Sequence, residues 1–67
     1  MSVARVTEIS ATSTKSFDDA VREGIKRANK TLRNIRGAWV KEQKVTVADG
    51  EVTHFVVNMM VTFELDT

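Results

Sequence analysis

The sequence predicts an α+β fold of βαββ order, in which one helix packs on a three-stranded antiparallel sheet. Three observations lead to this prediction. Apolar residues recur every three or four positions after residue 16, whereas β-branched residues are frequent before and after that region. The dipeptide Asp49-Gly50 separates two of the β-rich segments, as in a tight hairpin. The last segment, Thr53 to Leu65, is apolar on both of its faces.

A short first strand is expected from Val3 to Ser10, where β-branched residues lie among polar ones. The small polar residues from Ala11 to Lys15 are expected to connect this strand to the helix. Ser13 is suited to cap the helix. Ser16 is the alternative cap, because Asp19 lies three residues after it.

The helix is expected to run from Phe17 to Ile35 and to end at Arg36-Gly37, where the chain turns. Its apolar or small residues lie along one face: Phe17, Ala20, Val21, Gly24, Ile25, Ala28, Leu32 and Ile35. The opposite face is charged, with acids near the start and bases near the end, which complements the helix dipole. The functional alternative is a cationic ridge that binds anions.

A second strand is expected from Ala38 to Ala48, and Asp49-Gly50 then turns the chain into the third strand. Because the third strand is the most apolar, we place it in the centre of the sheet. With a two-residue turn, the hairpin residues on the face away from the helix are Trp39, Lys41, Gln43, Val45, Val47, Val52, His54, Val56, Asn58 and Met60. A three-residue turn with a bulge would swap this assignment.

The third strand needs cover on both faces. One face carries Phe55, Val57, Met59, Val61, Phe63 and Leu65. Val56 and Met60 fall on the other face, and a chain of 67 residues can lay one layer of protein over a sheet but hardly two. The chain also lacks cysteines for disulfide bonds. We therefore expect other copies of the chain, or a ligand, to close the second face.

The composition excludes several partners. Ten basic and nine acidic side chains give a formal charge of +1, too balanced for the broad positive field that nonspecific nucleic-acid binding requires. The N-terminal segment lacks the apolar core of a signal peptide, and no segment approaches the roughly 18 apolar residues of a membrane span. We expect a cytoplasmic protein with neither a nucleic-acid nor a membrane partner.

Residues that carry chemistry are scarce. There is no cysteine, and the single histidine, His54, is expected to be a polar residue at a subunit contact rather than a catalytic base or metal ligand. The glycines are isolated and form no phosphate-binding loop. We therefore expect a protein that is not an enzyme. Trp39 suggests a ligand, because an exposed indole offers a flat surface for a planar heterocycle. The alternative is an anchor packed between copies.

Several short segments, in this order and spacing, resemble the dodecin family. They are Thr12-Ser13, Ala28 to Leu32, Trp39 to Gln43, Asp49-Gly50, His54-Phe55 and Val61 to Asp66. The resemblance covers nearly the whole chain and implies a single dodecin-like domain over residues 1–67. It further implies a βαββ subunit, a hollow homododecamer, and the storage or buffering of flavins such as FMN or riboflavin.

The flavin site implied by the resemblance is altered here. Flavin-binding dodecins stack a tryptophan on the flavin ring and bond its edge with a glutamine, and these positions fall on Gly37 and Val56. Trp39 lies two residues further, about 7 Å along the strand. A variant flavin site would use Trp39 for stacking, with Lys41, Gln43 and Asn58 as polar contacts. The alternatives are a shell for metal ions or another small ligand, and an empty scaffold.

Overall fold

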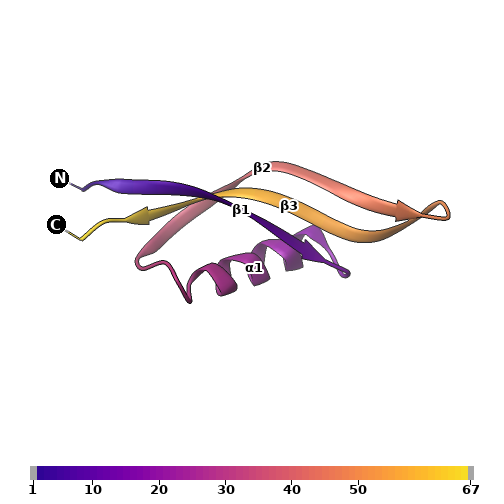
Figure 1. Ribbon diagram of the computed structural model, residues 1–67, viewed down its shortest axis with the longest axis horizontal. Helices are drawn as coiled ribbons and strands as arrows, with labels where there is room; N and C mark the ends of the chain where they lie inside the picture. Colours follow the sequence, from indigo (N-terminus) through magenta and orange to yellow (C-terminus); the bar gives the residue numbers. More distant parts are fainter. Residues whose placement is uncertain (1, 67) are drawn as a thin grey trace.

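The computed structural model describes residues 2–66 and has the predicted βαββ order. Strand β1 (Ala4–Ser13) leads into helix α1 (Phe17–Ala28), and strands β2 (Ile35–Ala48) and β3 (Glu51–Glu64) follow as a hairpin. The sheet order is β1-β3-β2 with antiparallel pairing, which confirms the central place of the third strand. Helix α1 lies along one face of the sheet (Figure 1). The two end residues of the predicted domain lie outside the described residues.

The core lies between α1 and the helix-facing row of β3. Val57, Met59 and Val61 of β3 are fully buried, and so is Ala20 of α1. Five further side chains pack against the cluster formed by Ala20, Val57 and Met59; they are Ile9, Ala11, Phe17, Val21 and Ile25. Removing these apolar surfaces from water is the main favourable term in folding. The predicted apolar stripe and the helix-facing row are therefore confirmed where α1 covers the sheet.

The helix begins at the second of the two candidate caps. The Ser16 hydroxyl accepts a hydrogen bond from the backbone N–H of Asp19 at 2.9 Å. Ser13 instead ends β1 and is buried. Its hydroxyl donates to the Asp19 carboxylate at 2.6 Å and accepts from the backbone N–H of Lys15 at 2.9 Å. Ser13 thus fixes the connection, while Ser16 satisfies a free donor of the first helical turn.

The predicted helix end is wrong, because α1 stops at Ala28 rather than near Ile35. The Ala28 carbonyl accepts from the backbone N–H groups of Thr31 at 3.0 Å and Leu32 at 2.9 Å, which closes the last turn. Asn34 then takes a left-handed conformation, with φ of 60°, which Asn tolerates better than most residues. The apolar Ile35, which fits the helical spacing, belongs to β2 and pairs with Phe63.

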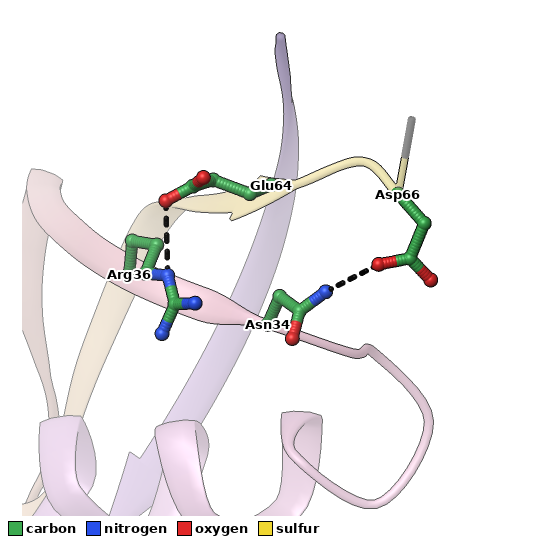
Figure 2. A network of polar contacts seen from close by, with 4 residues as sticks. All are labelled: Asn34, Arg36, Glu64 and Asp66. Atoms are coloured by element: carbon green, nitrogen blue, oxygen red, sulfur yellow. Dashed lines mark hydrogen bonds and ion pairs between the residues drawn. The ribbon is translucent and has the colours of Figure 1, made fainter. Parts of the chain in front are cut away.

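Polar contacts join the start of β2 to the end of β3 (Figure 2). Arg36 Nε donates to Glu64 Oε1 at 3.0 Å, and Asn34 Nδ2 donates to Asp66 Oδ1 at 3.0 Å. The backbone N–H of Glu64 also donates to the Asn34 carbonyl at 3.0 Å. Since Arg36 and Gly37 both lie within strand β2, the predicted turn at Arg36-Gly37 is replaced by the turn at Asn34.

Strands β1 and β2 are longer than predicted. The small polar residues Ala11 to Ser13 continue β1 and pair with Val57 to Phe55. Their composition is typical of a loop, but their backbone belongs to the sheet. Strand β2 begins three residues before Ala38, once the helix has ended early. Within residues 2–66, no helix is long and apolar enough to span a membrane.

Candidate functional site

The sheet face opposite α1, here called the outer face, carries the residues that suggest a ligand. Cross-strand partners in an antiparallel sheet point to the same side, so the register assigns each side chain to a face. The outer face carries Glu8, Ser10 and Thr12 of β1, Val56, Asn58 and Met60 of β3, and Trp39, Glu42 and Lys44 of β2. The predicted second apolar row of β3 is therefore present, interrupted by one asparagine.

The predicted two-residue turn is confirmed, but the simple alternation that followed from it is not. Asp49 and Gly50 have φ of 53° and 77°, as a tight hairpin of this kind requires, and Ala48 pairs with Glu51. Register shifts then occur between Thr46 and Val47 and between Val40 and Glu42. Each shift leaves one residue without a partner. The β2 residues from Glu42 to Thr46, between the two shifts, therefore lie on the face opposite to the one that simple alternation predicts.

Gln43 is therefore not on the face of the other predicted site residues. It pairs with Val57, a buried residue of the helix-facing row, and Val45 likewise pairs with Phe55. The prediction that Gln43 and Val45 share the outer face with Trp39 is wrong, because a bulge at Lys41 adds one residue to β2. Glu42 takes the place opposite Asn58 instead.

Trp39 is the aromatic side chain of the outer face, where most of its neighbours are polar. It pairs with Met60, which pairs in turn with Glu8 on β1. Its side chain is 53% exposed, although an indole is among the largest apolar groups a protein can bury. The pairings from Gly37 to Val40 are consecutive, so Gly37 and Trp39 share the outer face as expected from regular alternation. Trp39 thus offers a stacking surface within the subunit.

Polar side chains surround the Trp39–Met60 pair. Lys41 Nζ lies 3.4 Å from Glu8 Oε1, so the lysine reaches over the outer face toward β1. Asn58 Nδ2 donates to Glu42 Oε1 at 3.0 Å. Exposed pairs of this kind contribute little to stability, so their groups can exchange partners for a ligand. The arrangement combines a flat apolar surface with cationic, amide and carboxylate groups.

The sequence predicted three of these residues together, Trp39, Lys41 and Asn58, and missed Glu8 and Glu42. Glu8 could have been found from the first strand, because it alternates with the helix-facing Ile9 and pairs with Met60. Glu42 could not, because its face depends on the bulge. His54 lies apart from the group, within hydrogen-bonding distance of the hydroxyls of Thr46 at 3.1 Å and Thr53 at 3.0 Å. Among residues 2–66 no three His, Asp or Glu side chains form a group that could hold a metal ion.

Comparison with known proteins identifies the family. The model of the Dodecin family matches residues 3–66. This chain belongs to the dodecin family. The predicted resemblance is thereby confirmed, and so is the fold class that it implied.

Solved dodecins agree with this assignment in fold and sequence. The dodecin from Streptomyces davaonensis is 41% identical over 98% of this chain and 97% of its own, with a TM-score of 0.94. The dodecin from Streptomyces coelicolor is 35% identical over 98% of this chain and 94% of its own, with a TM-score of 0.93. A search of curated protein sequences gives no significant match.

A third similar dodecin is named for a metal ion. The calcium dodecin of Mycobacterium tuberculosis, described as a calcium-chelating antigen with a novel calcium-binding site, is 31% identical to this chain. The match covers 96% of this chain and 91% of the relative, with a TM-score of 0.82. The dodecins similar to this chain thus include one named for a metal ion.

Proposed function

We propose that this dodecin forms a closed homo-oligomer, a homododecamer as the family resemblance implies, that sequesters a small planar ligand without catalysing a reaction. The proposed ligand is a flavin, FMN or riboflavin, and the proposed location is the cytoplasm. The observation that carries the proposal is Trp39, which is 53% exposed beside Met60 on the sheet face away from the helix.

The outer face suits a flavin ring in a place shifted from the family's usual one. Val56 can neither donate nor accept a side-chain hydrogen bond, so a flavin edge buried against it would lack a partner, at about 1–3 kcal/mol per unsatisfied group. In the proposed position near Trp39, the polar edge of the flavin ring meets Lys41 and Asn58 instead of Val56. Both are donors for carbonyl oxygens of the ring, and the lysine ammonium also suits the phosphate of FMN. Gln43 points to the other face and is not part of this site.

The test is a titration with FMN and riboflavin that follows the quenching of flavin and Trp39 fluorescence. We expect quenching of both signals in the wild-type chain, its loss in Trp39→Ala, and partial retention in Trp39→Phe, which keeps an aromatic face. Lys41→Gln should weaken the binding of FMN more than the binding of riboflavin, because only FMN carries a phosphate.

Val40→Ala is the matched control, since Val40 neighbours Trp39 but pairs with Met59 on the opposite face. Mass photometry of every variant separates a lost site from a lost particle. An intact wild-type particle that quenches no flavin at tens of micromolar would exclude the flavin site.

A divalent cation is the second candidate ligand. It is favoured by the similarity to the calcium dodecin and by Glu8 and Glu42, two carboxylates on the outer face. Oxygen ligands of this kind suit Ca²⁺. Calorimetric titration with CaCl₂ should then show binding that is weakened by Glu8→Gln and Glu42→Gln but unchanged by Trp39→Ala. FMN binding that is weakened by Trp39→Ala but unchanged by the two glutamine variants would instead support the flavin.

A further inference from the structure

The β2–β3 hairpin extends past the rest of the subunit as an arm, residues 46–54. The last pair between β1 and β3 is Ser13 with Phe55, so only two strands remain beyond it. Figure 1 shows the arm projecting beyond the N-terminal end of α1. A two-stranded ribbon is at best marginally stable in water. The arm nevertheless exposes Val47 by 60% and Val52 by 50%, two residues that pair across its strands.

A groove of about 580 Å³ lies elsewhere on the subunit, between α1 and the edge strand β1. Its apolar lining comes from Ile9, Ala11, Gly24, Ala28 and Leu32. Arg27 and Glu23 also line it, and Lys26 on the helix and Lys30 just after the helix lie beside these two residues. The groove is thus apolar inside, and basic side chains gather beside it near the end of α1.

We propose that the arm of one copy docks in the α1–β1 groove of the next copy. This inference rests on the proposed homo-oligomer and adds which surfaces meet. The valines of the arm supply the apolar surface that the groove can take up. Asp49 and Glu51 at the arm tip meet the basic side formed by Arg27, Lys26 and Lys30, so charge complementarity favours this occupant over other apolar segments.

The contact joins two copies rather than closing within one. The arm continues the β2–β3 ladder past the N-terminal end of α1 (Figure 1). The groove lies alongside α1 and reaches Thr31 and Leu32, in the turn after the helix. An arm-to-groove contact uses two different patches of the subunit, so each copy can bind one neighbour through its arm and a second neighbour through its groove. Such heterologous contacts close into rings when the rotation permits, which suits a closed shell.

Disulfide trapping tests the contact directly, because the wild-type chain has no cysteine. The double variant Val47→Cys/Thr31→Cys carries one thiol on the arm and one at the groove. Under oxidation we expect dimers and larger species on a nonreducing gel, while each single variant stays at subunit size. Val47→Cys/Lys15→Cys, with its second thiol in the exposed loop before α1, is the matched control and should stay at subunit size.

Dimers from Val47→Cys alone would show that arms meet arms and would overturn the proposal. An intact particle in which neither Val47→Cys/Thr31→Cys nor Val47→Cys/Leu32→Cys is trapped would also overturn it. A wild-type chain that mass photometry finds monomeric would overturn the proposed oligomer itself, so the two failures are distinguishable.

Charge reversal provides an independent test. Glu51→Lys and Arg27→Glu should each shift the mass distribution toward smaller species, more strongly at low salt than at high salt. The combined variant should return the distribution toward that of the wild-type chain. Absence of any recovery in the combined variant counts against the proposed pairing of tip and groove.

Discussion

Gly24 and Gly37 differ in what a side chain would meet. A Cβ at Gly24 would lie 2.7 Å from Met59 Cε and 2.9 Å from Ala11 Cβ, whereas one at Gly37 would meet nothing within 4 Å. Met59 is fully buried, and the Ala11 methyl is fixed to the β1 backbone, so neither can withdraw freely. Gly24 therefore sets how closely α1 approaches the sheet.

Gly24→Ala should destabilise the protein despite the better helix propensity of alanine. Overpacking costs about 1–3 kcal/mol, and the propensity gain of about 1 kcal/mol offsets only part of it. Gly37→Ala should change the free energy of unfolding by no more than about 0.5 kcal/mol. Urea unfolding of both variants measures the difference, and equal stabilities would contradict a tight contact at Gly24.

The start of α1 is fixed by two serines with separate tasks. Ser16 caps the helix through the Asp19 N–H, and Ser13 holds the Asp19 carboxylate and the loop backbone. A sequence pattern can find both serines but cannot rank them, since each is followed by residues suited to a first helical turn. The ranking depends on where β1 ends, which is set by its pairing with β3.

Ser16→Ala should lower the free energy of unfolding by about 1 kcal/mol, because it leaves a helix N–H without its cap. Thr14→Ala is the control, since Thr14 lies exposed in the same loop. Thermal unfolding followed by circular dichroism would show the difference. If Thr14→Ala lowered the free energy of unfolding as much as Ser16→Ala, the destabilisation would come from changes in the loop rather than from the missing helix cap.

The order of elements, the central strand and the Asp49-Gly50 turn were predictable from the sequence, because they depend on local periodicity and turn chemistry. The end of α1 was not, since Leu32 and Ile35 continue the helical spacing although they lie beyond the helix. The composition of the candidate site was predictable in part. Trp39, Lys41 and Asn58 follow from alternation, but the exclusion of Gln43 follows from bulges that no local signal indicated.

The described subunit is unusually elongated. Its extents are 51 × 19 × 14 Å, and its radius of gyration is 13.8 Å, whereas a compact chain of this length is expected to have about 11 Å. Both the arm and the outer face keep apolar side chains exposed, among them Trp39, Val47 and Val52. At the scale of the whole molecule, these features support the proposed homo-oligomer.

Met60→Asp should abolish the particle. Met60 lies on the outer face, and a carboxylate buried there by a second copy would be costly without a partner. Mass photometry should then find subunit-sized protein, with loss of circular dichroism if folding depends on assembly. Thr14→Asp, which places the same charge in an exposed loop, should leave the particle intact. A full-sized Met60→Asp particle would show that this face remains in water.

The bulge at Lys41 has a consequence for how this protein can change over time. Val40 keeps its partner Met59 and Glu42 keeps its partner Asn58, so the residue between them has no place in the ladder. Its identity, and even its presence, can therefore vary while the strands on either side stay aligned. Replacement or deletion at this one position is the simplest route by which the ligand preference of the shell could drift without a change of fold.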